Sequence, residues 1–101
     1  MLPRVPEGYT SSWAQYTVQL PEGVDRAALQ GALKERGVPT MVYYPKPMHE
    51  QGAFGGACVV APGGCSVTEH LCSTVLSLPM GPYVSAEDAW MAATALLDCL
   101  E

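Results

Sequence analysis

The side chains best suited to bind a polar ligand gather in one short segment of the sequence. Tyr43, Tyr44, Lys46 and His49 lie within the run Y-Y-P-K-P-M-H. Proline fixes its own φ near −65° and pushes the preceding residue toward extended geometry, and both Tyr44 and Lys46 precede a proline. The sequence therefore predicts a rigid turn that presents two phenol hydroxyls, an ammonium and an imidazole to a ligand. The alternative interpretation is a proline-stiffened surface loop whose side chains are only solvated.

No complete catalytic motif accompanies this turn. The sequence has no G-x-S-x-G elbow, phosphate-binding P-loop, G-x-G-x-x-G fingerprint or H-E-x-x-H pair. The second histidine, His70, has no partners at ligand spacing, so we expect it to have a surface or packing role. A cysteine nucleophile needs a histidine held beside it, and Cys58 in a glycine-rich segment is poorly placed for that geometry. We expect no catalytic residue in this chain.

The four cysteines, Cys58, Cys65, Cys72 and Cys99, are spread loosely and include no C-x-x-C pair. Zinc sites usually need closely spaced ligand pairs, so the spacing argues against a metal site or a redox module built on these thiols. Cys72 and Cys99 lie among apolar residues in helical patterns, where a free cysteine acts as a small buried hydrophobe. Cys58 and Cys65 would form a disulfide only in an oxidising compartment, and we expect reduced thiols.

Length and charge exclude two classes of partner. A chain of 101 residues corresponds to one domain with a modest core. The net charge of −5 and the absence of any Lys/Arg cluster argue against a nucleic-acid-binding face. No apolar run approaches the roughly 20 residues that a membrane span needs, and no signal-peptide pattern opens the chain. We therefore expect a cytoplasmic protein with no nucleic-acid or membrane partner.

Apolar periodicity predicts three strands and three helices. Residues 13–20 alternate as a half-buried strand, whereas residues 1–12 lack periodicity and indicate a linker or tail before a domain at 13–101. Helix start signals occur at Asp25 and in the capping-box patterns Ser66 with Glu69 and Ser85 with Asp88. The expected elements are strands at 13–20, 40–44 and 76–80, helices at 25–36, 66–73 and 86–100, and a glycine-rich loop at 52–65.

Such an order of elements predicts an α+β fold. We expect a two-layer sandwich of a small, three-stranded, mostly antiparallel sheet and about three helices, with the strand at 76–80 in the middle. The apolar stripes that should face the sheet are spaced at helical intervals. They comprise Ala28, Leu29, Ala32 and Leu33 in the first helix, and Ala89, Trp90, Ala93, Leu96, Leu97 and Leu100 in the last.

Four motifs occur in a fixed order along the chain. They are W-A-Q-Y at 13–16, G-V-P-T followed by Y-P-K-P-M-H between 37 and 49, V-L-S-L-P-M at 75–80, and S-A-E-D at 85–88. In this order and spacing they resemble the C-terminal part of the DegT family of pyridoxal-phosphate-dependent sugar aminotransferases. The resemblance extends from about Trp13 to Leu100, which is nearly the whole chain.

The resemblance implies a function that this chain serves only as one part of an enzyme. Members of the family are fold-type I aminotransferases, usually homodimers, that act on keto sugars attached to nucleotides, and the expected pathway is surface polysaccharide biosynthesis. A large domain holds pyridoxal phosphate on a lysine, and a small C-terminal domain closes the site. This chain is similar to the small domain alone. Neither Lys34 nor Lys46 matches the cofactor lysine, so we expect the isolated chain to be inactive and to bind no cofactor.

Two departures from the family affect the expected substrate contacts. Many members have H-Y-P where this chain has Tyr43-Tyr44-Pro45, and the loop at 52–65 is longer and richer in glycine and cysteine. By resemblance, Tyr43, Tyr44, Lys46 and His49 are the expected substrate-binding residues, while W-A-Q-Y is similar to the branch that acts on uronic-acid sugars. The alternative hypothesis is a free-standing small α+β binding or interaction module with the same fold.

Overall fold

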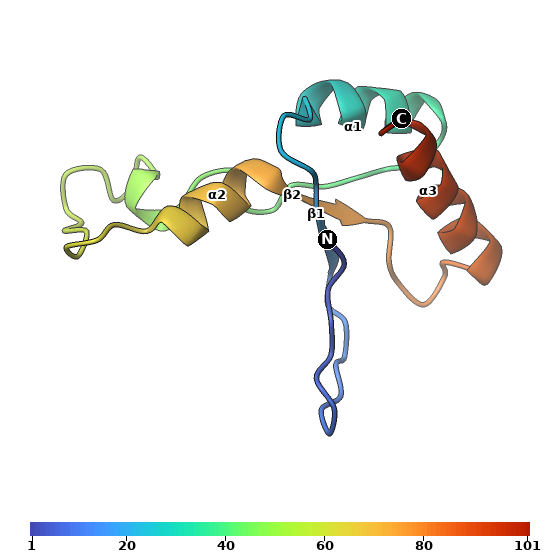
Figure 1. The fold of residues 1–101 in the computed structure, drawn as a ribbon, viewed down its shortest axis with the longest axis horizontal. Helices are drawn as coiled ribbons and strands as arrows, with labels where there is room; N and C mark the ends of the chain where they lie inside the picture. The colour runs from blue at the N-terminus through green and yellow to red at the C-terminus, as the bar shows by residue number, and fades with distance from the viewer.

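The computed structural model describes residues 1–101 and confirms the α+β class (Figure 1). The elements follow the order strand, helix, short 3₁₀ helix, helix, strand, helix. Their bounds are β1 (Tyr16–Gln19), α1 (Arg26–Glu35), η1 (Met48–Glu50), α2 (Ser66–Thr74), β2 (Val75–Leu78) and α3 (Ala86–Asp98). None of these helices has the length and apolar character that crossing a membrane would require.

The sheet has two strands rather than the three that we expected. β1 and β2 pair antiparallel, with Val18 opposite Leu76. The predicted strand at 40–44 is reduced to one bridge, in which Met41 and Ser77 exchange hydrogen bonds of 3.0 and 2.8 Å. On one side of the bridge, the antiparallel register would set Pro39 opposite Pro79, and neither proline has an N–H to donate to a ladder. β2 nevertheless lies in the middle, between β1 and Met41, as predicted.

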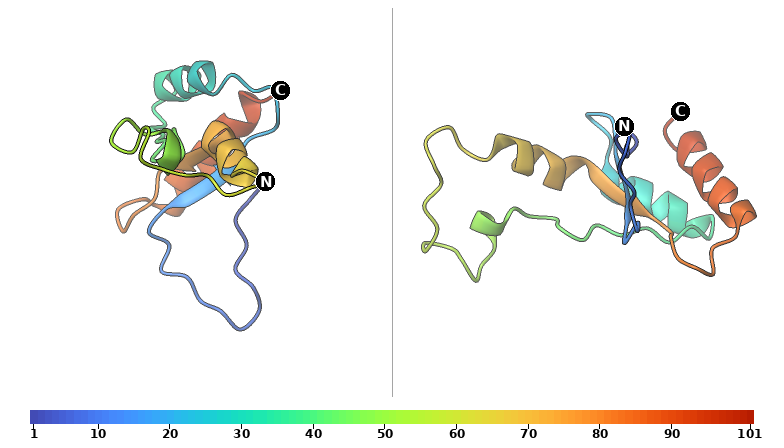
Figure 2. Two further views of the ribbon diagram at one scale, coloured as in Figure 1. Left: turned by 90° about the vertical axis from the view of Figure 1, so that its left-hand side faces the viewer. Right: turned by 90° about the horizontal axis from the view of Figure 1, so that it is seen from below.

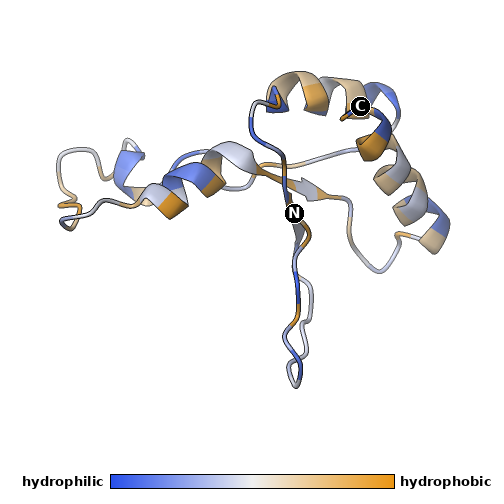
Figure 3. Cartoon of the chain, viewed as in Figure 1, coloured by the Kyte–Doolittle hydropathy of each residue, from blue (hydrophilic) through white to orange (hydrophobic).

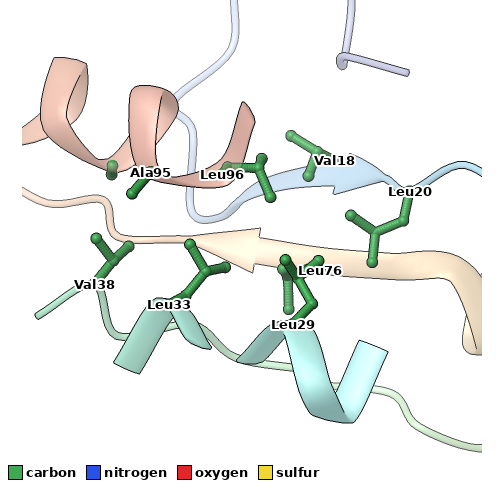
Figure 4. Packing of buried hydrophobic residues seen from close by; sticks show 9 residues of the cluster. Val18, Leu20, Leu29, Leu33, Val38, Leu76, Ala95 and Leu96 are labelled. Carbon is green, nitrogen blue, oxygen red and sulfur yellow. The ribbon is translucent and has the colours of Figure 1, made fainter. Parts of the chain in front are cut away.

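The core lies between one face of this sheet and the helices α1 and α3 (Figure 4). Leu33 and Leu76 are completely buried, and Val38 is nearly so. The buried cluster comprises Val18, Leu20, Leu29, Leu33, Val38, Leu76, Ala92, Ala95 and Leu96. The other face of the sheet is polar at Thr17, whose Oγ1 lies 2.8 Å from the hydroxyl of Ser77. The core is therefore small and depends on a few aliphatic side chains.

Helix α1 begins and ends as the sequence predicts. The carboxylate of Asp25 accepts a hydrogen bond of 3.0 Å from the N–H of Ala28, as an N-cap residue does. Gly37 follows the helix with a φ of +79°, a left-handed conformation that glycine adopts without a steric penalty. Leu29 and Leu33 are buried as expected, but Ala28 is exposed, so the buried stripe is narrower than the pattern indicated.

Helix α3 begins at the predicted capping box, in which Ser85 and Asp88 cap one another. Its buried face differs from the prediction: Ala92, Ala95 and Leu96 are buried, whereas Trp90 is 76% exposed and Leu97 is 63% exposed. The two buried alanines have small side chains, which allow the helix backbone to approach the sheet closely. Of the six residues in the predicted stripe, only Leu96 is fully buried.

Residues 44–74 form an arm that extends away from the core (Figures 1 and 2). It contains η1, the loop at 52–65 and α2, and Figure 3 shows apolar residues near its tip as well as in the helices of the core. The predicted capping box at the start of α2 was wrong, because Ser66 is already the first helical residue and Cys65 occupies the N-cap without a side-chain bond. All four cysteines are free.

Arg26 joins the arm to the core. Its Nη1 donates hydrogen bonds of 2.7 Å to the carbonyl oxygen of Cys72 and 3.0 Å to that of Val75. The last carbonyl groups of a helix have no partners within the helix, so a cation at this end stabilises it. Arg26 therefore fixes the end of α2 relative to the beginning of α1.

The N-terminal segment 1–12 has no helix or strand and returns to the edge of β1. The N–H of Gln19 donates to the carbonyl of Met1 over 2.9 Å, and the terminal ammonium of Met1 donates to the carbonyl of Gln19. Trp13 follows this segment with a φ of +50°, which is uncommon for a bulky residue, and its ring lies 5.3 Å from that of Tyr16. The segment thus forms an open loop that extends away from the sheet (Figures 1 and 2).

Candidate functional site

The proline turn brings Tyr43 to a hollow at the end of the sheet. Tyr43 follows the bridge at Met41, and both residues line a depression of about 240 Å³. Its other lining residues are Ala14, Gln15, Pro39, Thr40, Ser77, Leu78, Pro79 and Met80. The mixed polar and apolar lining suits a ligand that carries both rings and hydroxyl groups. Tyr43 is half exposed, so its hydroxyl is accessible from solvent.

A second hollow lies next to the first and shares part of its wall. This hollow has a volume of about 360 Å³ and is mostly apolar, with Tyr16, Val84 and residues of α3 along its sides. Leu78, Pro79 and Met80 line both hollows. Pro79 ends β2, as expected of a proline at a strand terminus, and so places Met80 between the two depressions. The sequence had indicated this segment only as a strand.

Tyr44 and Lys46 lie beyond the hollow on the exposed side of the turn. Tyr44 is 64% exposed, and the side chain of Lys46 is also exposed. Pro47 between Lys46 and η1 is buried, and its carbonyl accepts a hydrogen bond of 3.0 Å from the N–H of Glu50. The turn is therefore anchored at Pro47. The phenol group of Tyr44 and the ammonium group of Lys46 are free to contact another molecule or domain.

His49 occupies a different environment from the tyrosines. Its Nε2 lies 3.3 Å from a carboxylate oxygen of Glu69 in α2 and 3.8 Å from one of Glu50. The imidazole is 19% exposed, so it is the most buried of the four predicted site residues. Nothing in the sequence marked Glu69 as a partner of His49, because its spacing from Ser66 fitted a capping box. In the structure, Glu69 instead closes the base of the loop at 52–65 against His49.

The four predicted residues therefore divide into three groups: Tyr43 in the hollow, Tyr44 and Lys46 on the exposed turn, and His49 beside α2. His70 belongs to none of these groups, and its Nε2 lies 2.8 Å from the side-chain amide of Gln19. The hollows contain no arrangement of nucleophile and base. This geometry can position a ligand.

The pKa of one carboxyl group, that of Asp88, is shifted by the capping box of α3. The pKa of Asp88 is lowered because its carboxylate accepts hydrogen bonds from the side chain and the backbone N–H of Ser85. This shift belongs to the capping box of α3 and has a structural cause. Within the turn, Lys46 is the one lysine or arginine side chain, so it is the natural contact for an anionic group of a ligand.

Comparison with known proteins identifies relatives over nearly the whole chain. A profile of the DegT/DnrJ/EryC1/StrS aminotransferase family matches residues 1–96. UDP-N-acetyl-3-dehydro-alpha-D-glucosamine 3-aminotransferase of Acidithiobacillus ferrooxidans is 39% identical over 95 residues, which cover 94% of this chain and 24% of the relative. UDP-2-acetamido-2-deoxy-3-oxo-D-glucuronate aminotransferase of Pseudomonas aeruginosa is 36% identical over 86 residues, covering 85% of this chain and 22% of the relative.

A solved structure shows the same fold. The crystal structure of a DegT DnrJ EryC1 StrS aminotransferase from Brucella abortus superimposes with a TM-score of 0.83 and 39% sequence identity. The match covers 96% of this chain and 25% of the Brucella protein. The chain thus spans about a quarter of the length of the proteins to which it is similar.

Proposed function

Because the chain belongs to the DegT/DnrJ/EryC1/StrS aminotransferase family, we propose that it is the C-terminal small domain of a pyridoxal-phosphate-dependent aminotransferase that acts on a nucleotide-linked keto sugar. The observation that carries this proposal is the match of residues 1–96 to the family, together with a structural match covering 96% of the chain. In this proposal the remaining part of the enzyme is a large domain that this chain closes, and a second subunit completes a homodimer.

The names of two relatives define the substrate class that we propose. Both names specify a UDP-linked sugar that carries a nitrogen substituent and whose carbon 3 is oxidised to a ketone. The sugar is a glucosamine in one relative and a glucuronate in the other. The W-A-Q-Y opening at residues 13–16 supports the uronic-acid form, and surface polysaccharide biosynthesis is the proposed pathway. Pyridoxal phosphate supplies the amino-transfer chemistry of such an enzyme, and the protein positions the substrate around it.

The side chains of this chain do not fit a cofactor site. A lysine that forms a Schiff base is activated by desolvation or by a neighbouring cation, but both Lys34 and Lys46 are exposed. Every buried polar side-chain atom has a hydrogen-bond partner within the chain. None is therefore available to bind the phosphate group or the pyridine nitrogen of the cofactor. We therefore assign the cofactor and its lysine to the rest of the enzyme, and we expect the isolated chain to lack transaminase activity.

The proline turn is the part of this chain that we assign to substrate binding. Tyr43 lines the hollow at the end of the sheet, and exposed Tyr44 and Lys46 are free to meet the sugar nucleotide against the large domain or the partner subunit. A tyrosine hydroxyl donates to a phosphate, carboxylate or sugar oxygen, and an ammonium group pairs with an anionic group. His49 would contribute from the base of the arm.

Labelling with pyridoxal phosphate tests the assignment of the cofactor lysine. The purified 101-residue chain is incubated with pyridoxal phosphate, reduced with borohydride and analysed by mass spectrometry after proteolysis. We expect only weak, non-stoichiometric labelling, distributed between Lys34 and Lys46, because both amines are exposed. Stoichiometric labelling of Lys46 alone would place the cofactor site in this chain and overturn the proposal. A coding sequence without a region for a large domain would favour a free-standing binding module instead.

A further inference from the structure

From the contacts of His49, Glu50 and Glu69 we infer that the base of the arm is a binding site for a divalent transition-metal cation of the zinc class. The three side chains offer one imidazole nitrogen and two carboxylate oxygens, and these atoms all lie within 4.8 Å of one another. His49 and Glu50 come from η1 and Glu69 comes from α2, so a cation here would join the two ends of the loop at 52–65.

The separations of these atoms are close to those that a zinc-class ion imposes. A tetrahedral ion with bonds of about 2.0–2.1 Å to nitrogen and oxygen holds its ligand atoms about 3.3–3.4 Å apart. The Nε2 of His49 lies 3.3 Å from Oε1 of Glu69 and 3.8 Å from Oε1 of Glu50. The Glu50 side chain is 53% exposed, so its carboxylate has room to move toward a bound ion.

Hydrogen bonding alone accounts for only part of this arrangement. One imidazole Nε2 carries at most one hydrogen, so it cannot form a full hydrogen bond to each carboxylate at once. Neither Glu50 nor Glu69 forms an ion pair with a lysine or arginine anywhere in the chain. A cation at this point would neutralise both carboxylates and accept the lone pair of a neutral imidazole. Water would complete the coordination shell, because both carboxylates are about half exposed.

Sequence spacing does not reveal this site. The adjacent pair His49 and Glu50 has no nearby third ligand along the chain, and only the return of α2 brings Glu69 to them. The site is also independent of the cysteines, which are the residues that metal-binding motifs would first suggest. Its occupant is a borderline ion that accepts nitrogen and oxygen ligands, because imidazole is a common ligand of zinc, cobalt and nickel.

Titration with Co²⁺ and Zn²⁺ tests the inference on the 101-residue chain without an affinity tag. Cys58→Ser and Cys65→Ser are introduced as the background, because Cys58 is exposed and Cys65 is partly exposed, and accessible cysteines would compete for either metal. We expect one saturable site per chain, seen as visible Co²⁺ absorption that Zn²⁺ abolishes. Affinity should fall at acid pH, because a protonated imidazole cannot bind a metal.

Substitution of the proposed metal-binding residues distinguishes a specific metal site from adventitious binding. His49→Ala and Glu69→Gln should each weaken binding at least tenfold, by comparison with the 10–100-fold loss that even outer-shell substitutions cause. The matched control is His70→Ala, which removes the other histidine and should leave the affinity unchanged. Absence of saturable binding, equal affinity of the Glu69→Gln variant, or an equal loss in His70→Ala would overturn the inference. Circular dichroism of each variant confirms that the fold is intact.

Discussion

Replacing Arg26 by methionine tests how strongly a single side chain fixes the arm on the core. Methionine keeps an apolar stem but removes the two hydrogen bonds to the carbonyls of Cys72 and Val75. A hydrogen bond from a charged group contributes about 1.5–3 kcal/mol. Because both bonds come from one nitrogen and Arg26 is only partly buried, we expect the free energy of unfolding to fall by about 2–3 kcal/mol.

A loss of that size should lower the melting temperature by roughly 10–20 °C in a domain of about 100 residues. Thermal and urea unfolding, followed by far-ultraviolet circular dichroism, measure both quantities. The matched control is Arg36→Met at the other end of α1, where Arg36 forms an exposed ion pair of 3.1 Å with Asp98. Exposed pairs contribute about 0–1 kcal/mol, so this control should change the melting temperature little.

The reasoning about Arg26 would be refuted if the Arg26→Met and Arg36→Met variants melted within a few degrees of each other. Arg26→Lys provides a finer test, because a single ammonium keeps the charge but matches two carbonyl oxygens less well than a guanidinium does. We expect this variant to recover only part of the lost stability.

Three further predictions concern the core, the last helix and the turn. Leu33→Ala should lower the free energy of unfolding by about 2–5 kcal/mol in urea titrations because Leu33 is fully buried, whereas Leu97→Ala should have little effect because Leu97 is exposed. The Asp88→Asn variant should melt below the parent at neutral pH. Because the pKa of Asp88 is lowered from 3.8 in the folded state, its contribution is present above that pH, and the difference should shrink as the pH falls below it. In the complete enzyme, Tyr44→Phe should reduce kcat/KM by about three- to tenfold without changing the melting temperature, and unchanged kinetics would make the turn only structural.

Local signals in the sequence predicted most helix boundaries, because the groups that cap a helix lie close to it in the chain. Asp25 and the pair Ser85 and Asp88 cap α1 and α3 as expected. The same reasoning failed at Glu69, which fits a capping pattern with Ser66 but contacts His49 instead. A contact between distant segments overrode the local pattern, and nothing in the spacing could reveal it.

Predictions about buried faces were less successful because they depend on tertiary packing. Periodicity placed Trp90 and Leu97 in the core, but α3 packs through Ala92 and Ala95, which allow it to approach the sheet. The strand expected at 40–44 became a single bridge at Met41, because the following prolines direct the chain into the arm. The chain bends at the predicted turn, whereas the hollow at Tyr43 depends on residues from three segments of the chain.

The central proposal is that this chain is one domain of a larger enzyme that transfers an amino group to a sugar. The decisive measurement is mass-spectrometric detection of the amino sugar formed from a UDP-linked 3-keto-2-acetamido sugar, with a mixture of amino acids as amino donors and pyridoxal phosphate present. The complete protein that contains this chain is predicted to form the amino sugar, and the 101-residue chain alone is predicted to form none. Product formation by the isolated chain, or inactivity of the complete protein toward glucosamine and glucuronate forms alike, would contradict the account.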